Sequence, residues 1–192
     1  SSAASDVYKR QSSYNNKVSK FIFLGSSCIY PKMAKQPLKE EYLLSGPLET
    51  TNQSYAVAKI SGVKLIESLR NQYNLDYISL MPTNLYGPFD NFDPISSHVL
   101  PAMIRKFYDA KQNNKDVKLW GTGTPMREFL YVDDLAQAVL FSSLRKMPGS
   151  LYNIGTGKDI SIEDLALIVQ RVVGHDKKIQ WDSDKPDGTP RK

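Results

Sequence analysis

From Lys20 onward, short runs of β-branched and aromatic residues alternate with longer segments in which apolar residues recur at helical spacing. Runs of the first kind are typical of buried strands, and the longer segments are typical of amphipathic helices. Strands that alternate with helices usually form a parallel sheet covered by helices. The pattern therefore predicts an α/β fold.

The predicted strands are short runs that end at glycine, proline or polar residues. They comprise residues 19–24, 75–81, 117–120, 128–132, 151–154 and 178–181. The predicted helices comprise residues 54–72, a segment that starts near Ser96 or Ser97 and runs through Lys111, a segment capped by Asp133 that runs to about Arg145, and residues 161–173. Thr51 or Asn52 is expected to cap the first helix, and Pro82 to stop the second strand.

Two features depart from a complete fold of this kind. Residues 1–16 are rich in Ser, Ala and Asn and show no period, so we expect a disordered tail or a remnant of cloning. A complete dinucleotide-binding fold also begins with a strand, a glycine-rich turn and a helix whose N-terminus holds the pyrophosphate. The sequence contains no G-x-G-x-x-G or G-x-x-G-x-x-G motif, and Gly121/Gly123 and Gly155/Gly157 are interpreted as turn glycines.

Composition indicates a folded domain. A chain of 192 residues with 41% hydrophobic and 23% charged residues can bury a sizeable core. Its apolar runs fall far short of the roughly 20 residues that a membrane-spanning helix needs. Cys28 is the single cysteine, so an intrachain disulfide is impossible, and no secretory signal pattern opens the chain. We expect a soluble, cytoplasmic protein with no membrane partner.

The formal net charge of +5 does not by itself indicate nucleic acid, because Lys and Arg are dispersed among 20 acidic residues. A solvated surface is the ordinary explanation of this charge. The alternative is a small anionic ligand such as a nucleotide diphosphate, which needs only about two or three convergent cations. We expect neither a nucleic-acid partner nor a metal site.

Tyr55 and Lys59 are four residues apart on a predicted helix, so their side chains lie on the same face. A nearby ammonium stabilises a phenolate, and we therefore expect Lys59 to lower the pKa of Tyr55 toward neutrality and to assist proton donation. The same lysine could hold the ribose hydroxyls of a cofactor. An ordinary amphipathic helix also produces this spacing often, so the pair alone has low specificity.

Hydroxyl and thiol groups follow the predicted strand 19–24, at Ser26, Ser27 and Cys28. The carboxyl ends of strands in a doubly wound sheet border the ligand crevice. Ser26 is therefore placed to hydrogen-bond a carbonyl oxygen that Tyr55 protonates. Cys28 has two interpretations, a small buried hydrophobic residue or a base that removes a proton from the substrate.

Longer motifs give a more specific indication. They are Gly25-Ser-Ser-Cys-Ile-Tyr-Pro31, Tyr55-x-x-x-Lys59, Pro82-Thr-Asn-Leu-Tyr-Gly-Pro88 with Asp90-Asn-Phe92, Ser97-His98-Val99, Trp120-Gly-Thr-Gly-Thr-Pro-Met-Arg-Glu-Phe129, Val132-Asp-Asp134, Asn153-Ile-Gly-Thr-Gly157 and Lys185-Pro-Asp-Gly-Thr-Pro-Arg-Lys192. From about Lys20 to Lys192 the chain resembles the GDP-L-fucose synthase family of extended short-chain dehydrogenase/reductases. Tyr-x-x-x-Lys is common to that superfamily, whereas the Ser-Ser-Cys, Ser-His-Val and Lys-Pro-Asp-Gly segments are much narrower.

This resemblance implies an NADPH-dependent epimerase-reductase. The family converts GDP-4-keto-6-deoxy-D-mannose to GDP-L-fucose by inverting the two carbons that flank the ketone and then reducing the ketone with NADPH. Cys28 and His98 match the family's proton-transfer pair. Ser26 and Tyr55 would stabilise the enolate, and Tyr55 with Lys59 would protonate the oxygen during reduction.

The resemblance also implies binding residues. For the nucleotide of the substrate it points to Lys106, Trp120, Arg127 and Asp187. For NADPH or NADP+ it points to Leu24, Gly25, Ser26, Ser27, Lys59, Pro82, Thr83, Asn84, Leu85 and His98. Without the motifs, Lys106 is interpreted as a solvated helix lysine, Trp120 as a core residue and Arg127 as a strand-edge residue. His98 alone suggests a helix-start residue, and His175 is expected at the surface.

The implied fold is a partial doubly wound, Rossmann-like parallel sheet that lacks its N-terminal glycine-rich βαβ unit, with a smaller C-terminal substrate-binding α/β part. Residues 17–95 are expected to belong to the NADP-binding domain, and residues 96–192 mainly to the substrate-binding part, with segments that return to the sheet. Family members are commonly homodimers that pair through the tyrosine-bearing helix and its neighbour. The apolar residues Val57, Ile60, Val63 and Leu65 would then serve either core or interface.

Other functions remain open at this point. A sugar-nucleotide 4-epimerase or 4,6-dehydratase shares the Tyr/Lys pair. A dehydratase would be expected to carry an Asp-Glu pair after the Ser or Thr at the strand end, where this chain has Ser26-Ser27-Cys28, and a 4-epimerase needs no Cys/His pair. The chain could also be a non-catalytic, nucleotide-sugar-binding fragment.

Overall fold

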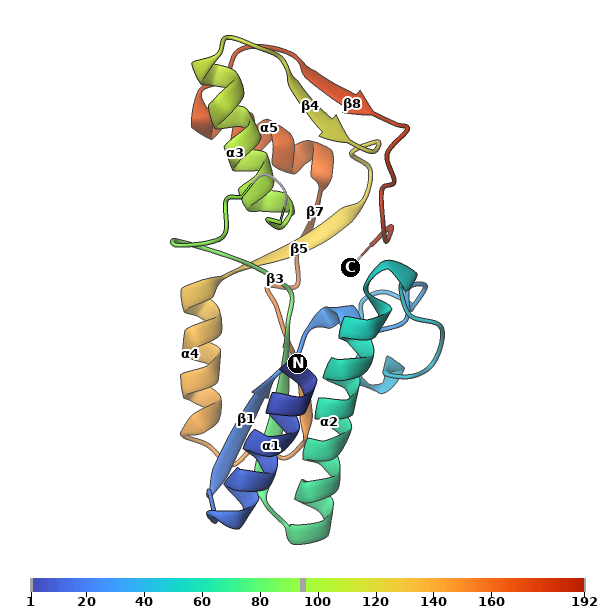
Figure 1. Ribbon diagram of the computed structural model, residues 1–192, viewed down its shortest axis with the longest axis vertical. Coiled ribbons are helices and arrows are strands. Elements are labelled where there is room, and N and C mark those ends of the chain that lie inside the picture. Colours follow the sequence, from blue (N-terminus) through green and yellow to red (C-terminus); the bar gives the residue numbers. More distant parts are fainter. Residues whose placement is uncertain (1, 94–95, 192) are drawn as a thin grey trace. The chain divides into compact units, whose positions relative to one another are not determined.

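The computed structural model describes residues 2–93 and 96–191, and its helices and strands are labelled in Figure 1. The chain divides into two compact units that interleave along the sequence. The first unit comprises Ser1–Leu85 and Leu130–Thr156, and the second comprises Tyr86–Phe129 and Gly157–Lys192. Each unit has its own hydrophobic core.

A three-stranded parallel sheet forms the centre of the first unit. Its strands are β1 (Lys20–Leu24), β2 (Asp76–Pro82) and β6 (Leu151–Ile154), in the order β1-β2-β6. The central strand β2 is buried from its second residue to its last, as expected for a strand that is covered on both faces. Because all three strands run the same way, their carboxyl ends lie at one edge of the sheet.

Helices α2 (Gln53–Tyr73) and α4 (Val132–Ser143) lie on opposite sides of this sheet in Figure 1, which is the doubly wound arrangement. The apolar residues Ala56, Ile60, Val63 and Ile66 recur at helical spacing, so they form the buried face of α2. Short 3-10 turns complete the unit: η1 (Ser27–Ile29), η2 (Glu40–Tyr42) and η3 (Thr50–Asn52).

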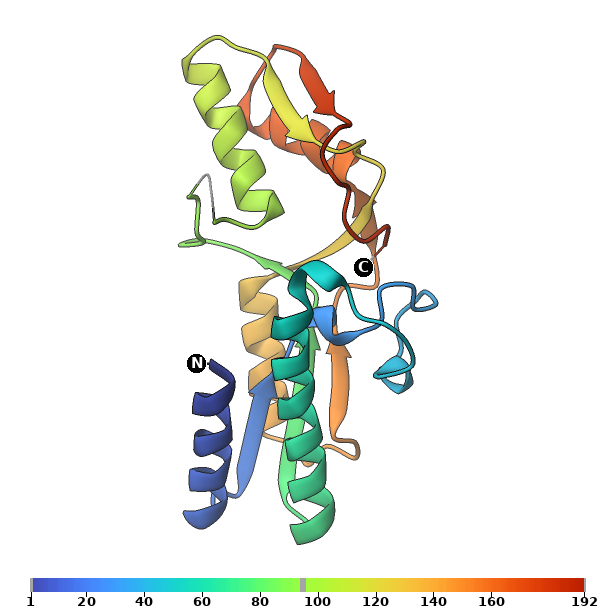
Figure 2. The ribbon, with the colours of Figure 1, turned by 45° about the vertical axis from the view of Figure 1, so that its right-hand side comes forward.

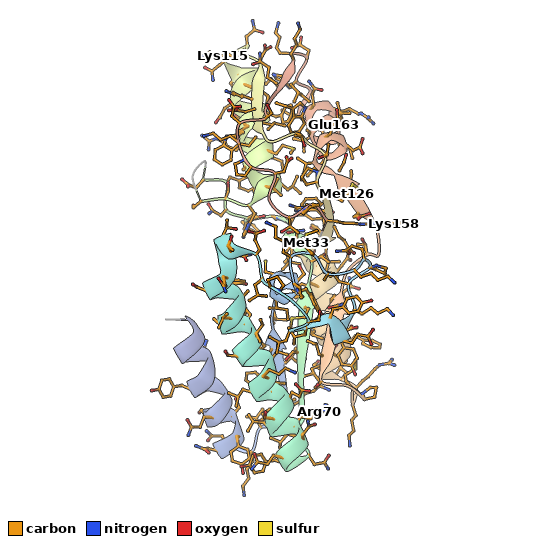
Figure 3. The ribbon with its side chains drawn as sticks, turned by 90° about the vertical axis from the view of Figure 1, so that its right-hand side faces the viewer. Met33, Arg70, Lys115, Met126, Lys158 and Glu163 are labelled. Carbon is orange, nitrogen blue, oxygen red and sulfur yellow. The ribbon has the colours of Figure 1, made fainter. Side chains whose placement is uncertain are left out.

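Arg70 fastens the C-terminal part of α2, where Figure 3 labels it. Its guanidinium donates hydrogen bonds to the carbonyl oxygens of Tyr77 at 3.3 Å, Met147 at 2.6 Å and Pro148 at 3.2 Å. It also pairs with Asp76. One side chain thereby links α2 to β2 and to the loop that follows α4.

Residues 2–15 form a helix, α1 (Ser2–Asn15), so the prediction of a disordered tail for residues 1–16 is wrong over this range. Figures 1 and 2 show α1 running beside α2, and the Tyr14 and Tyr73 ring centroids are 4.5 Å apart. Two backbone hydrogen bonds end the helix, from Val18 to Ser13 and from Lys17 to Tyr14, with Lys17 at a φ of 54°. This pattern is a Schellman motif. The helix depends on a tertiary contact and an end motif that composition does not reveal.

The described part of the second unit is built from helices α3 (Val99–Gln112) and α5 (Ile162–Val173) and from strands of two small sheets. Helices α3 and α5 pack against the parallel pair β4 (Val117–Trp120) and β8 (Ile179–Asp182). Strand β5 (Met126–Tyr131) pairs with β7 (Asp159–Ser161) in antiparallel fashion and, with β3 (Asn84–Tyr86), is the central strand of a three-stranded sheet in the order β3-β5-β7. The short strand β3 lies where the chain passes from the first unit to the second.

Most element boundaries agree with the sequence analysis to within two residues, and β4 and β6 agree fully. The three-residue strands β3 and β7 were not predicted. Asn52 occupies the N-cap position of α2 without a side-chain cap bond, and Thr51 lies in η3. Pro82 is the last residue of β2, as expected of a residue that stops a strand.

Three further expectations need correction. Helix α3 begins at Val99 rather than at Ser96 or Ser97, because His98 still has extended backbone angles. Asp133 does not cap α4, since Tyr131 occupies the N-cap position; Asp133 lies in the first turn, where a carboxylate favours the positive end of the helix dipole. His175 is not at the surface but is 6% exposed, because its ring packs edge-on against Phe107 and bonds the Lys115 carbonyl.

Across residues 2–93 and 96–191, none of the helices combines the length and the apolar character that crossing a membrane would require.

Candidate active site

The carboxyl edge of the sheet in the first unit gathers the segments that follow β1 and β2. The Gly25 N–H donates to the Leu80 carbonyl at 2.9 Å, and the Thr83 N–H donates to the Ile154 carbonyl at 3.1 Å. A Cβ at Gly25 would lie 2.1 Å from Met81 Cε, so a larger residue there would require the Met81 side chain to move. The predicted cofactor-binding segments 24–27 and 82–85 therefore meet at one edge.

Ser26 and Cys28 belong to one tight turn directly after β1. Ser26 is the N-cap of η1, and its Oγ accepts a hydrogen bond from the Cys28 N–H at 3.2 Å. Cys28 is half-buried and forms no disulfide, while the next residue, Ile29, is fully buried in the core. The buried Ile29 and the capping Ser26 fix the turn, so the backbone that bears the thiol is held on both sides.

Tyr55, in the first turn of α2, meets this turn. Its phenol forms a side-chain hydrogen bond with Ser26 and lies close enough to Cys28 for their charges to interact. Burial raises the pKa of Tyr55 above its ordinary value, the Ser26 hydrogen bond lowers it, and the charge of an ionised Cys28 raises it. The net shift of the pKa is upward, so Tyr55 keeps its proton at neutral pH. The Tyr55 side chain is only partly buried, with 47% exposed, so a ligand can reach it.

Lys59 lies one helical turn after Tyr55, as the spacing predicted, with its Nζ 5.8 Å from the Tyr55 ring centroid. The ammonium donates to the Leu24 carbonyl at 3.1 Å and lies 5.1 Å from the Phe23 ring centroid. The expectation of a lowered Tyr55 pKa is wrong for this structure. Burial of the phenol outweighs the effects that favour its ionised form, while the lysine binds the end of β1.

The predicted cofactor segments offer polar groups and open surface. Leu24 is 41% exposed at the end of β1. Thr83 Oγ1 is buried and has no hydrogen-bond partner within the described part of the chain. A buried hydroxyl without a partner is unfavourable, so a ligand that bonds it would remove that cost. Ser27, Pro82, Asn84 and Leu85 complete these segments at the same edge.

The remaining predicted residues lie in the second unit. His98 is the N-cap of α3; its side chain is exposed and caps no backbone N–H of that helix. Because Cys28 belongs to the first unit, the pairing of Cys28 with His98 stays a prediction.

Trp120 and Lys106 form a second cluster. Trp120 ends β4 and is 64% exposed, so it is not a core tryptophan. Lys106 Nζ lies 5.4 Å from the Trp120 ring centroid and donates to the Lys118 carbonyl, and burial lowers its pKa. Lys185 Nζ lies 5.7 Å from the same ring. Lys185 opens the Lys-Pro-Asp-Gly motif, and neither its spacing nor the resemblance indicated a role for it. An exposed ring with two ammonium groups is suited to an aromatic, anionic ligand.

Arg127 and Asp187 already have protein partners. The Arg127 guanidinium donates to the Met126 carbonyl at 2.7 Å. The Asp187 carboxylate accepts hydrogen bonds from the Thr122 N–H at 2.7 Å and from the Thr122 hydroxyl at 2.8 Å. A Cβ at Gly121 would lie 2.2 Å from Asp187 Oδ1, and Gly121 has a φ of 78°. Asp187 therefore holds the turn that follows Trp120.

Comparison with known proteins gives consistent matches. The model of the NAD dependent epimerase/dehydratase family matches residues 9–155. The chain is 58% identical over 176 residues to probable GDP-L-fucose synthase 1 of Oryza sativa subsp. japonica, covering 91% of this chain and 54% of that protein. It is 53% identical over 190 residues to GDP-L-fucose synthase of Escherichia coli (strain K12), covering 93% of this chain and 59% of that protein.

Among solved structures, a GDP-L-fucose synthetase from Naegleria fowleri bound to NADP matches with a TM-score of 0.89 and 30% identity, over 99% of this chain and 61% of that one. The chain thus spans little more than half the length of the relatives it matches. Helix α1 belongs to the shared fold, because the structural match extends over almost the whole chain.

These matches confirm the resemblance that the motifs indicated and the α/β, Rossmann-like fold class. The family model alone covers most of the chain, from α1 to the end of β6. The chain therefore belongs to the NAD dependent epimerase/dehydratase family.

Proposed function

We propose that this chain carries most of the catalytic groups of an NADPH-dependent enzyme that converts GDP-4-keto-6-deoxy-D-mannose to GDP-L-fucose by 3,5-epimerisation and 4-reduction. The single observation that supports this most directly is the hydrogen bond between Tyr55 and Ser26 beside Cys28. The similarity to GDP-L-fucose synthases of rice and E. coli supports the same substrate.

The Ser26 and Tyr55 hydroxyls would receive the 4-keto oxygen of the sugar. Both groups can donate a hydrogen bond, and a carbonyl oxygen that accepts two such bonds is stabilised when negative charge develops on it. The raised pKa of Tyr55 keeps its proton available at neutral pH. One pair of donors can therefore serve an enolate during epimerisation and an alkoxide during reduction.

Cys28 is the proposed base for epimerisation. Its thiolate would take the proton from a carbon next to the ketone, and the electron pair of that C–H bond would move to the 4-keto oxygen. His98 is the proposed acid that returns a proton from the opposite face, since histidine is the side chain that most often transfers protons in catalysis. Once Cys28 has released its proton to solvent and His98 has taken one up, the same exchange at the second flanking carbon completes the double inversion.

The residues at the sheet edge fit a nicotinamide cofactor. Leu24 to Ser27 and Pro82 to Leu85 would contact it, with the partnerless Thr83 hydroxyl and the Lys59 ammonium as polar contacts. When bound, NADPH would supply the hydride that reduces C4. Tyr55, assisted by Lys59, would then give its proton to the C4 oxygen.

For the GDP group, Trp120 offers an exposed ring, and Lys106 and Arg127 offer cations for the diphosphate. Asp187 would act mainly by holding the turn after Trp120, and it can also face the nucleotide. We also propose a cytoplasmic homodimer that pairs through the outer face of α2. Val57 is 49% exposed there, whereas Ile60 and Val63 belong to the core and Leu65 is half-buried.

Two substitutions in the full-length protein test the division of roles. Cys28→Ser should abolish solvent-deuterium incorporation at C3 and C5 of the keto-sugar, because the base is lost. Tyr55→Phe should retain measurable incorporation and lose NADPH oxidation by about 100-fold or more, which is the usual contribution of a positioned proton donor. Mass spectrometry of the recovered sugar nucleotide and absorbance of NADPH measure the two steps.

Two results would contradict the roles proposed for Cys28 and Tyr55. If Cys28→Ser exchanges deuterium and oxidises NADPH at the wild-type rate, the thiol is not the base. If Tyr55→Phe oxidises NADPH normally, another group donates the proton.

A further inference from the structure

Tyr30 and Asn153 lie in two of the motifs quoted above, and neither has a role in the proposed chemistry. They are 123 residues apart in sequence, yet the Tyr30 hydroxyl donates a hydrogen bond to Asn153 Oδ1 at 2.6 Å. The Tyr30 side chain is buried, with 4% exposed. A short hydrogen bond in the core joins the segment after β1 to β6, on the far side of β2.

Asn153 uses its other polar groups in the same region. Its side-chain Nδ2 donates to the Leu38 carbonyl at 3.1 Å, and its backbone N–H donates to Glu40 Oε1 at 2.8 Å. The donor and the acceptor of the amide side chain are thus both engaged. Asn153 therefore connects three segments: the one that ends in Tyr30, the loop at Leu38 and Glu40, and β6.

Tyr30 remains a donor at any physiological pH. Burial raises the pKa of Tyr30 strongly, and the negative charge of Glu40 raises it further, while the bond to Asn153 opposes these effects. The phenol therefore keeps the proton that the bond to Asn153 requires.

Tyr30 also ends the turn that carries Cys28. It is the C-cap of η1, and its N–H donates to the Ser27 carbonyl at 3.3 Å. At the other end of the turn, Ser26 caps the Cys28 N–H and bonds Tyr55. Hydrogen bonds consequently connect the beginning of the turn to α2 and its end to β6, and Cys28 lies between these two connections.

We propose that Tyr30 and Asn153 are positioning residues that fix the direction of the Cys28 thiol. This proposal rests on the role of Cys28 in the proposed function, but the placement of the thiol can be measured without any reaction. Loss of the Tyr30–Asn153 bond frees the C-terminal end of the turn, while Tyr55, Ser26 and Lys59 keep their contacts. Proton abstraction, which needs close alignment of base and C–H bond, should suffer more than substrate binding.

The chain offers a matched control for Tyr30→Phe. Tyr77 is a fully buried tyrosine of the same core cluster, and its hydroxyl has no hydrogen-bond partner in the described structure. Tyr77→Phe removes the same atom from the same core without breaking a hydrogen bond. The difference between the two variants isolates the bond to Asn153.

Both variants are compared with wild type in the full-length protein by two measurements. Alkylation of Cys28 by iodoacetamide, followed by mass spectrometry of the Cys28 peptide, reports the exposure of the thiol. In Tyr30→Phe we expect alkylation to rise about threefold or more. Solvent-deuterium incorporation should fall about tenfold or more with KM changed less than about twofold, since small misplacements of reacting groups cost this much. Tyr77→Phe should match wild type in both.

The proposal is overturned if Tyr30→Phe behaves like Tyr77→Phe, or if it only lowers the thermal midpoint and leaves the alkylation rate unchanged. Asn153→Ala removes the acceptor instead of the donor and serves as the second variant if Tyr30→Phe does not fold. A changed alkylation rate in an enzyme whose wild type exchanges no deuterium would support the placement of Cys28 by Tyr30 and would instead refute the proposed function.

Discussion

At Tyr55, opposing effects set the acidity of a single phenol. Burial raises its pKa, the hydrogen bond from Ser26 lowers it, and ionisation of Cys28 raises it. The coupling to Cys28 has a mechanistic consequence: when the thiolate forms, Tyr55 holds its proton more firmly. The proposed base and the proposed acid can therefore coexist in their working forms, a thiolate beside a protonated phenol.

Tyr30 makes a prediction about alkaline stability. Its pKa is raised in the folded chain, whereas an unfolded tyrosine titrates near about 10. A raised folded pKa contributes stability that is present below pH ~10 and is lost as the pH rises above it, because the unfolded chain releases the proton first. The free energy of unfolding of wild type should thus fall more steeply above pH ~10 than that of Tyr30→Phe.

Urea unfolding of the full-length protein between pH 8 and about 11.5 measures this difference, with a limiting slope of about 1.4 kcal/mol per pH unit for one proton. The control is Tyr8→Phe, the same substitution at a side chain that is 71% exposed. Parallel pH profiles for wild type and Tyr30→Phe would contradict the buried, proton-holding role of Tyr30.

At the scale of elements, the helices and strands that depend on local sequence patterns were predicted correctly. The features that depend on contacts between distant segments were not. Strands β4 and β6 and helix α2 follow from apolar periodicity, which acts over a few residues. Helix α1 does not, because its order involves the Tyr14–Tyr73 contact between segments far apart in sequence. Burial of His175 against Phe107 is likewise a tertiary effect.

In the candidate site, too, local patterns predicted some residues, and features that depend on the folded structure were missed. Tyr55 and Lys59 were found from helical spacing, and Ser26 and Cys28 from their place at a strand end. The direction of the Tyr55 pKa shift was missed, because it depends on burial by the folded surroundings. The Tyr30–Asn153 bond was also missed, because no local pattern joins residues in two separate motifs. Only the motif membership of Tyr30 and Asn153 could have drawn attention to them.

Helix α1 allows a test by paired substitutions. Lys17 has left-handed backbone angles at the end of the helix, with a φ of 54°, a conformation that glycine adopts without strain. Lys17→Gly should therefore raise the free energy of unfolding by about 0.5–1 kcal/mol. Lys9→Gly, the same change inside the helix, should lower it by about 0.5–1 kcal/mol. Urea denaturation of the full-length protein measures both.

Opposite signs for the two substitutions are the signature of a helix that ends in a Schellman motif. If both substitutions left the free energy of unfolding unchanged, residues 2–15 would not form a helix in solution.

At the scale of the whole molecule, the chain separates the proposed chemistry from the proposed recognition. The first unit carries Ser26, Cys28, Tyr55 and Lys59 at the carboxyl edge of its parallel sheet. The second carries the exposed Trp120 with Lys106 and Lys185, and it contributes His98.

The most direct test of the central claim is the reaction of the full-length protein with GDP-4-keto-6-deoxy-D-mannose and NADPH in deuterium oxide. We expect NADPH oxidation and a GDP-L-fucose product that carries solvent deuterium at C3 and C5 and a cofactor-derived hydrogen at C4. A protein that binds the sugar nucleotide without oxidising NADPH, or a reduced product that retains protium and the original configuration at C3 and C5, would contradict the account.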